Sequence, residues 1–417
     1  MLSGAPRGRF RAVLRAVLRA VLRIVLWLAA AGAVHAEAAP EAAYAPVVRG
    51  QALSFPRDFG AHPDYRTEWW YITGWLRDAT GTERGFQLTF FRVRTRIGED
   101  NPSRFAPRQL ILAHAAVADP ASGRLRHAER AARVHPGLVE AREGHTGVQL
   151  DDWFLHAAGT GQGGDAADRP EASGVDRRAA AGAPSTGQQV GPGWPMLYRS
   201  RISAEDFAFE LEFATAQAPV ENGEHGFSQK APDPRNASYY YSRPQLAVRG
   251  SLRLDGAAFA VSGHAWLDHE WSSEILPAGA RGWDWIGINL HDGGSLMAFQ
   301  MRDHAGGALW HAGTWTGAGG ERRTFGPGAL RFTPLRHWRS PRSGTEYPVE
   351  WALELDDGRR LLLRPLMDDQ ELDSRASTGA IYWEGAVRLY QAEAEGREVE
   401  IGEGYLEMTG YAERLGM

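Results

Sequence analysis

The densest group of polar side chains in this 417-residue sequence is the run Gly263–Trp271. If this run is a β-strand, its period of two places His264, Asp268 and Glu270 on one face, together with Trp266. Charged side chains seldom line a face that points into a protein unless they are paired or functional. A carboxylate beside a tryptophan in a half-buried cavity has its pKa raised by the loss of water, which suits a general acid. The run therefore predicts acid chemistry centred on Asp268.

The same residues allow two other interpretations. They could form a hydrogen-bonded network that fixes the junction of two domains, with Arg243 or Arg281 as counter-ion. His264, Asp268 and Glu270 could also supply nitrogen and oxygen ligands to a metal ion. No HExxH-like spacing accompanies them, so we predict neither a metal site nor a cofactor. The choice depends on register, because a slip by one residue turns the opposite face of the run inward.

Tryptophan is abundant, with 15 residues, and clusters near the expected strands. Aromatic strand residues most often belong to a core, but a β-barrel with many inward aromatic side chains can hold one flat or extended apolar ligand. The candidate ligand-binding residues are Trp69, Trp70, Tyr71, Tyr240, Trp266, Trp271, Trp283 and Trp285. We expect their pocket at or near the junction of two domains.

The elements that must position these residues are β-strands. Apolar and polar residues alternate over residues 207–213 and 349–355, the period of a half-buried strand. Three Asp-Gly pairs, at 255–256, 292–293 and 357–358, lie between such runs and predict tight hairpins. One short helix is expected around His127–Val134. The predicted fold class is all-β, and 49 glycines and 23 prolines agree with a turn-rich chain.

Two features divide the chain. Residues 157–193 are poor in large apolar side chains, so we predict a disordered insertion there. The stretch Pro232–Ala237 is rich in proline and polar residues, which is typical of a domain boundary. We therefore predict a first β domain over residues 54–235, which contains the insertion, and a second over residues 236–417. Each has a size that fits one barrel or sandwich.

The first 36 residues have the composition of a secretory signal peptide. They carry six arginines and no acidic residue, and an apolar stretch covers Ile24–Val34. Val34 and Ala36 are the small residues that signal peptidase requires, so we predict cleavage after Ala36. The apolar stretch is short for a membrane span of about 20 residues. We expect a flexible leader over residues 37–53 and a mature protein that is periplasmic or secreted, without stable membrane insertion.

Composition argues against several classes of function. The chain has no cysteine, which excludes disulfides, thiol nucleophiles and cysteine-ligated metal centres. Its formal net charge is -5, and removal of six arginines with the signal peptide leaves -11. No basic stripe remains for nucleic acid. The patterns GxSxG, GxGxxG and the P-loop are absent, which disfavours serine hydrolases and nucleotide-binding proteins.

Six runs of this sequence together resemble proteins of the AttH-like and carotenoid 1,2-hydratase (hydroxyneurosporene synthase) superfamily. These runs are His62–Gly74, Gly85–Arg92, Gly226–Lys230, Asn236–Ser242, Trp266–Trp271 and Gly282–Gly287. The resemblance extends from about Pro56 to Glu413, apart from the insertion. It implies two lipocalin-like antiparallel β-barrel domains packed together, in agreement with the hairpin pattern.

The resemblance also implies a role for Asp268. In the hydratases a Tyr-x-Asp pair is central, and its aspartate protonates an alkene. Here Asp268 keeps the acid, whereas Trp266 stands in place of the tyrosine. The hydratases also use a histidine and a tryptophan a little upstream, where this chain has Tyr239–Tyr241. The resemblance therefore implies acid catalysis by Asp268, whereas these two departures argue against carotenoid hydration.

We predict an exported protein that binds an elongated apolar ligand, such as a lipid, polyene or isoprenoid. As an enzyme it would be a hydratase-type lyase: Asp268 protonates a C=C bond, and water oriented by His264 or Glu270 completes the hydration. One alternative is a non-catalytic accessory protein for lipid or lipoprotein transport that works with an ABC-transporter permease. The resemblance to some bacterial members of the superfamily implies this role. The other is a secreted hydrolase with Asp268 and Glu270 as its carboxylates. No nucleic-acid partner is expected.

Overall fold

The computed structural model describes residues 44–103, 105–158, 196–274, 276–393 and 396–413. The predicted signal peptide, the leader before residue 44 and residues 159–193 of the predicted insertion lie outside these ranges. The described residues form β-strands and one 3-10 turn, η1 (Arg57–Phe59), and the predicted all-β class is confirmed. Among them we find no helix with the length and apolar character that a membrane crossing requires.

The first sheet is antiparallel and has 13 strands. In spatial order it contains β4 (Arg124–Arg133), β3 (Gln109–Asp119), β2 (Glu83–Arg94), β1 (Thr67–Asp78), β13 (Ala257–Ser272), β12 (Ala237–Leu254), β9 (Phe207–Thr215), β8 (Met196–Ser203), β7 (Trp153–Ala158), β6 (Gly147–Leu150) and β5 (Val139–Ala141). Two short strands, β10 (Val220–Glu221) and β11 (Phe227–Gln229), also pair with β12. Since β3 and β4 come close to β5 and β6, the sheet curls into a nearly closed barrel.

The second sheet has ten antiparallel strands from the C-terminal part of the chain. Its spatial order is β17 (Arg322–Phe325), β16 (Ala308–Thr316), β15 (Ser295–Asp303), β14 (Ala280–Leu290), β23 (Glu398–Met408), β22 (Ala380–Ala392), β20 (Arg360–Pro365), β19 (Glu346–Leu355) and β18 (Leu330–Arg339), with β21 (Glu371–Ser374) paired to β22. This sheet also curls, because β16 approaches β18. The fold is thus two packed, curled antiparallel sheets, here called the first and second barrels, of which the first is nearly closed; this agrees with the predicted all-β architecture.

The three Asp-Gly pairs all form the hairpins predicted for them. They connect β12 to β13, β14 to β15, and β19 to β20. At the first of these turns both residues have positive φ, 48° for Asp255 and 85° for Gly256. Two positive φ values in a two-residue loop match the right-handed twist of the strands that it joins.

Two sequence-based predictions are corrected by the strand pairing. Residues 127–133, expected in a helix, belong to the edge strand β4, because pairing with β3 overrides the local preference of an Ala- and Arg-rich segment. The expected boundary at residues 235–236 is a hairpin loop between β11 and β12, which pair through Phe227 and Tyr239. The chain passes from the first sheet to the second between Ser272 and Ala280 instead.

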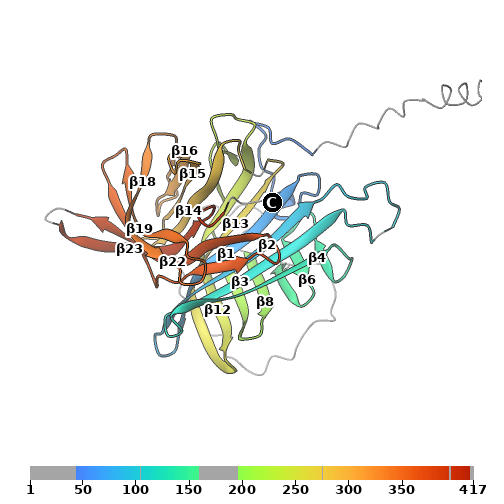
Figure 1. Cartoon of the computed structure of the whole chain (residues 1–417), viewed down its shortest axis with the longest axis horizontal. Helices are drawn as coiled ribbons and strands as arrows, with labels where there is room; N and C mark the ends of the chain where they lie inside the picture. The colour runs from blue at the N-terminus through green and yellow to red at the C-terminus, as the bar shows by residue number, and fades with distance from the viewer. Residues whose placement is uncertain (1–43, 104, 159–195, 275, 394–395, 414–417) are drawn as a thin grey trace, which may run out of the picture. The chain divides into compact units, whose positions relative to one another are not determined.

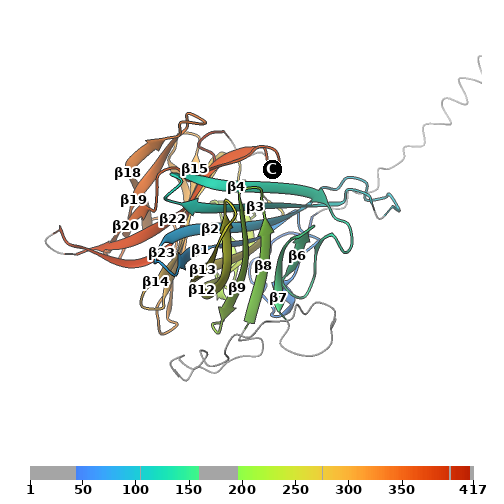
Figure 2. The same cartoon turned by 90° about the horizontal axis from the view of Figure 1, so that it is seen from below.

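The two barrels meet along β1, β2, β12 and β13 of the first and β14, β22 and β23 of the second. Figures 1 and 2 both show β1 and β13 on the side of the first barrel that faces the second, and Figure 2 shows β6 to β8 on the far side. The backbone at Gly85 comes very close to side chains of the second barrel, since a Cβ atom there would lie 2.7 Å from both Ala386 Cβ and Tyr405 Oη. The indole nitrogen of Trp75 donates a hydrogen bond across the junction to Gly404 O at 3.0 Å.

Along β1 and β13, successive side chains point to opposite faces of the sheet. One face contributes Trp70, Leu267 and Trp271 to the interior of the first barrel. The opposite face contributes Tyr71 and Trp266 to an aromatic cluster between the barrels. The candidate functional site is built on that second face.

Candidate functional site

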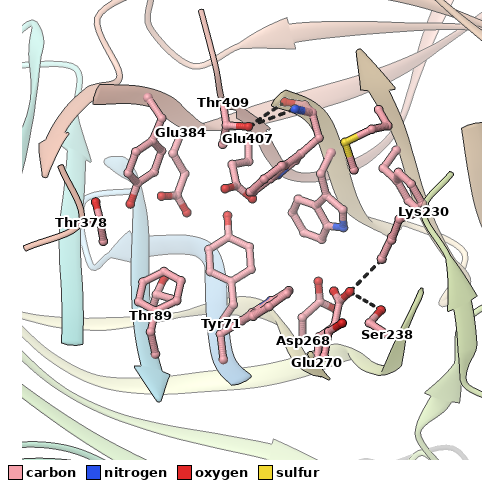
Figure 3. A pocket seen from close by; sticks show the side chains of 18 of the residues that line it. Tyr71, Thr89, Lys230, Ser238, Asp268, Glu270, Thr378, Glu384, Glu407 and Thr409 are labelled. Carbon is pink, nitrogen blue, oxygen red and sulfur yellow. Dashed lines mark hydrogen bonds and ion pairs between the residues drawn. The ribbon is translucent and has the colours of Figure 1, made fainter. Parts of the chain in front are cut away.

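A cavity lies between the two barrels, where β1 and β13 face β14, β15, β22 and β23 (Figure 3). Its volume is about 130 Å³, close to that of an engineered cavity of roughly 150 Å³ that holds one benzene ring. The cavity is partly open to the surface, so a longer ligand can extend out of it. Its lining is mainly apolar but includes five carboxyl side chains, Asp268, Glu270, Glu274, Glu384 and Glu407.

Strand β13 directs two of the predicted catalytic side chains into this cavity. Asp268 and Glu270 both line it, because residues two apart share one face of a strand. His269, between them, points to the opposite face and stacks on Trp70 with ring centroids 4.7 Å apart. The register that the sequence left open is therefore the one with the acids at the cavity.

His264 occupies the same face of β13 but lies outside the cavity. It is four residues before Asp268, which is about 13 Å along a strand. Half of its side chain (52%) is exposed, and its Nδ1 lies 4.0 Å from Glu403 Oε1. His264 is thus too far from Asp268 to orient a water molecule beside it, which corrects the role expected from the sequence.

Asp268 is buried and accepts three hydrogen bonds from side chains. Ser242 Oγ and Trp266 Nε1 donate to Oδ1 at 2.6 and 2.7 Å. Tyr240 Oη donates to Oδ2 at 2.7 Å and accepts a hydrogen bond from Trp285 Nε1 at 3.0 Å. A carboxylate can accept about two bonds at each oxygen, so Oδ1 is saturated and Oδ2 has one position left for a proton.

The environment of Asp268 makes it an acid that works near neutral pH. Burial raises its pKa to about 7, although the hydrogen bonds from Ser242, Tyr240 and Trp266 act in the opposite direction. The same three donors remain in place when the proton leaves, so they stabilise the conjugate base. Asp268 can therefore hold a proton at the cavity and release it without rearrangement of its neighbours.

Glu270 has a different environment from Asp268. Its Oε1 lies 2.8 Å from the ammonium of Lys230, which is the one lysine of the chain, and it also accepts a hydrogen bond from Ser238. Lys230 is held over the rings of Tyr240 and Phe299 at 4.8 and 4.5 Å. The ion pair with Lys230 fixes the Glu270 carboxyl group at the cavity wall, two residues along the strand from Asp268.

A second pair of acids lies on the opposite wall, on β22 and β23. Glu384 is directly opposite Glu407 across the two antiparallel strands. Burial raises the pKa of Glu384 well above its ordinary value, and the charge of Glu407 adds to the effect. Burial also raises the pKa of Glu407 to about 7, assisted by the charges of Asp268 and Glu270.

The predicted aromatic residues divide into three groups. Trp69, Tyr71, Trp283 and Trp285 line the cavity. Tyr240 and Trp266 stand behind the lining and hydrogen-bond to Asp268. Trp70 and Trp271 point into the first barrel, which corrects their expected role in ligand binding. The reason is the strand period, because Trp69 and Trp70 are neighbours and must face opposite ways.

The opposite face of β1 and β13 carries a separate polar network. Glu68 Oε1 lies 2.7 Å from His62 Nδ1 and 2.8 Å from His269 Nε2, and Arg92 Nε donates to Oε2 at 2.7 Å. Burial alone would raise the pKa of Glu68, but Arg92 and the two histidines outweigh it and hold the pKa well below its usual range. The two histidines and Glu68 lie close enough together to ligate a metal ion, but Arg92 and their mutual hydrogen bonds already engage them.

Comparison with known proteins decides the family. A family model described as AttH-like matches residues 46–177 and 185–411. The chain belongs to the AttH-like family. A solved structure of a candidate AttH from Nitrosomonas europaea is 45% identical, covers 88% of this AttH-like chain and 99% of the other, and superposes with a TM-score of 0.73.

Two further proteins to which this AttH-like chain is similar carry the name kievitone hydratase. The protein of that name from Fusarium solani subsp. phaseoli is 20% identical over 180 residues, which are 42% of this chain and 49% of the relative. The chain thus aligns with about half the length of that curated relative. The solved structure of kievitone hydratase from Nectria haematococca is 14% identical over 88% of this chain and 95% of the other, with a TM-score of 0.59. That likeness shows a shared fold.

Sequence reasoning missed Glu384 and Glu407 of this AttH-like protein. Each lies within an apolar strand run, 380–387 for Glu384 and 404–408 for Glu407. A single acidic residue inside such a run is a sign of a buried, functional carboxyl. That sign was present, but the two residues meet only through the pairing of β22 with β23.

Proposed function

We propose that this AttH-like protein binds an apolar ligand in the cavity between its barrels and adds water to a C=C bond of that ligand, with Asp268 as the proton donor. The observation that carries this proposal is a buried acid with a pKa of about 7 on the wall of an aromatic cavity. An acid with a pKa near the working pH both holds its proton and transfers it readily. The names of the hydratase relatives support the same class of reaction.

In the proposed reaction, the π electrons of the alkene take the proton from Asp268 Oδ2. A C–H bond forms, and the neighbouring carbon becomes a carbocation. Tyr240, Ser242 and Trp266 stabilise the aspartate that remains. A water oxygen then forms the C–O bond, and Glu270 accepts the proton that the water loses. Loss of this proton to solvent and uptake of one by Asp268 restore the site.

The aromatic lining supports a cationic intermediate. The indole rings of Trp283 and Trp285 line the cavity on the wall that faces β13. An aromatic face attracts a desolvated cation by about 1–2 kcal/mol per well-placed ring. A water molecule beside Glu270 would capture such a cation.

Turnover by the Asp268→Asn variant tests the proposal. Geraniol, a small isoprenoid with two C=C bonds, is incubated with the protein in oxygen-labelled water, and the products are analysed by mass spectrometry. We expect label in a hydrated product and a loss of about 10²–10⁴-fold in rate for Asp268→Asn, with geraniol affinity retained. Glu354→Gln, which changes an exposed carboxylate on β19, is the control. Binding without hydration in the unchanged protein would overturn the catalytic proposal and favour a carrier.

We also propose that the protein is exported and acts in the periplasm or outside the cell. The support is the signal-peptide pattern of the first 36 residues. The intact mass of the protein, purified from the periplasm of its own cells, tests this proposal. A chain that begins at Glu37 supports it, and a chain that retains Met1 contradicts it. A permease that co-purifies would favour the transport alternative, and organic extraction would identify any bound ligand.

A further inference from the structure

The wall of the cavity formed by β22 and β23 contains polar groups that the proposed hydration does not use. Glu384 and Glu407 face the cavity from adjacent strands, and the hydroxyl of Tyr71 points toward them from the first barrel (Figure 3). Glu384 is buried, with 1% exposure. Glu384 Oε1 and Tyr71 Oη have no partner at hydrogen-bond distance and angle among the described residues. The hydroxyls of Tyr71 and Tyr382 are nevertheless close enough to Glu384 to oppose the rise of its pKa that burial causes.

These unpartnered atoms are unusual for a buried site. Most buried polar atoms have a partner, and a buried donor or acceptor without one costs about 1–3 kcal/mol. A carboxyl that holds its proton donates one hydrogen bond and still accepts others, and a phenol does the same. Together Glu384 and Tyr71 therefore offer both a donor and an acceptor to a group that enters the cavity between them.

The charge of the cavity limits what that group can be. Five carboxyl groups line it, and its one lysine, Lys230, is already paired with Glu270. His114, the histidine of the lining, is held neutral because burial lowers its pKa to about 3. An anionic ligand group would thus be buried without a counter-ion, which is strongly unfavourable.

We propose that Glu384 and Tyr71 form a binding subsite for an uncharged hydroxyl group, so that the cavity selects apolar alcohols or phenols over fatty acids and over plain hydrocarbons. The hydroxyl donates to one of the two unpartnered oxygens and accepts from the other. The apolar part of the ligand then extends along Trp283 and Trp285 toward Asp268. This inference rests on the proposed ligand-binding function, but it does not require catalysis.

Three probes of similar size test the subsite: geraniol, the hydrocarbon myrcene and geranic acid. Their dissociation constants are measured at neutral pH by quenching of tryptophan fluorescence, since tryptophans line the cavity. One to two new hydrogen bonds correspond to about tenfold in affinity. We expect geraniol to bind about tenfold more tightly than either myrcene or geranic acid.

Two variants of Glu384 sharpen the test. Glu384→Leu should lower the affinity for geraniol to that for myrcene, and it should leave the affinity for myrcene unchanged or increase it. Glu384→Gln should keep most of the preference for geraniol, because an amide both donates and accepts. Tyr71→Phe should remove part of the preference, and Glu354→Gln should leave all three affinities unchanged.

Any other result would contradict the proposed hydroxyl-binding subsite. Equal affinity for geraniol and myrcene, or an equal loss of both in Glu384→Leu, would mean that the hydroxyl is not recognised. Tighter binding of geranic acid would assign this wall to an anion. The experiment measures binding, so it separates the two proposals. A preference for geraniol without hydration supports the subsite and contradicts the hydratase activity. Hydration without any preference supports the hydratase activity and contradicts the subsite.

Discussion

The hydroxyl of Tyr240 lies 2.7 Å from Asp268 Oδ2, and the indole N–H of Trp285 fixes that hydroxyl from 3.0 Å away. Tyr240 and Asp268 belong to paired strands of the first barrel, whereas Trp285 belongs to β14 of the second. The orientation of the acid therefore depends on how the two barrels pack. This arrangement explains why the site lies at their junction and not inside either barrel.

Tyr240→Phe should raise the pKa of Asp268 further above about 7. The variant removes the donor to Oδ2, and a hydrogen bond to the charged form favours that form. It also leaves the N–H of Trp285 unpartnered, at a cost of about 1–3 kcal/mol in the free energy of unfolding. The infrared carbonyl band of the protonated acid, followed against pH with Asp268→Asn as the blank, measures the shift.

The neighbouring tyrosine provides a matched control for that experiment. Tyr239 points away from the cavity, and its hydroxyl donates to Val48 O at 3.1 Å. Tyr239→Phe should leave the titration of Asp268 unchanged. A midpoint in Tyr240→Phe that stays the same or falls would show that this hydroxyl does not control the acid.

Asp268→Asn should change how stability depends on pH. The folded-state pKa of Asp268 is about 7, above the ordinary value of 3.8, so the folded protein keeps a proton that the unfolded chain loses. The resulting stabilisation is complete below about pH 4 and is lost as the pH rises through 7. It amounts to at most about 4 kcal/mol, since one pKa unit is about 1.4 kcal/mol.

Urea unfolding of both proteins at about pH 4 and pH 8 measures this effect. Asparagine does not ionise, so the unfolding free energy of the unchanged protein should fall more steeply between the two pH values than that of the variant. The difference between the two proteins at each pH removes the contributions of the other acids. The same fall in both proteins would mean that Asp268 stays charged in the folded state.

Local sequence patterns predicted the strands and hairpins but not how far the first barrel extends. The Asp-Gly turns and the alternation over 207–213 are local signals, and they appear in the structure as expected. The prolines at 232 and 234 also mark a turn correctly, but a turn signal does not distinguish a hairpin loop from a domain boundary. That distinction depends on the pairing of β1 with β13, in which Glu68 is opposite Trp271. These two residues are separated by about half of the sequence.

The same limit applies to the candidate site. Asp268 and Glu270 stand out in the sequence because they share one strand with aromatic residues. Glu384 and Glu407 belong to strands more than a hundred residues later, and only the packing of the second barrel brings them to the cavity. Trp69 and Trp70 look equivalent in the sequence, and the register of β1 alone decides that one faces the cavity and the other the core.

Glu407→Gln should stabilise the protein at high pH. Burial raises the pKa of Glu407 to about 7, so above that pH the folded protein buries a charged carboxylate at a cost. The variant removes this charge, which lies directly opposite Glu384, and lowers the pKa of Glu384, since the charge of Glu407 contributes to its rise. Urea unfolding should show the gain at about pH 8 and little change at about pH 5, where both acids hold protons.

A variant of an exposed acid shows whether such a gain in stability is specific to Glu384 and Glu407. Glu354→Gln removes a carboxylate from β19 without touching the cavity, and it should have little effect at either pH. If Glu407→Gln instead destabilises the protein at pH 8, the carboxylate of Glu407 has a stabilising partner that outweighs the cost of its burial.

Arg92→Gln should destabilise the protein strongly without disturbing the acid at the cavity. Arg92 pairs with Glu68 inside the first barrel, and loss of one partner of a buried ion pair costs about 3–5 kcal/mol. Glu68 and Asp268 lie on opposite faces of the sheet, so the infrared titration of Asp268 should not move. The double variant Arg92→Gln, Glu68→Gln should recover part of the stability, because it no longer buries an unpaired charge. A shift in the Asp268 titration would instead mean that the two faces are coupled through β13, where His269 contacts Glu68.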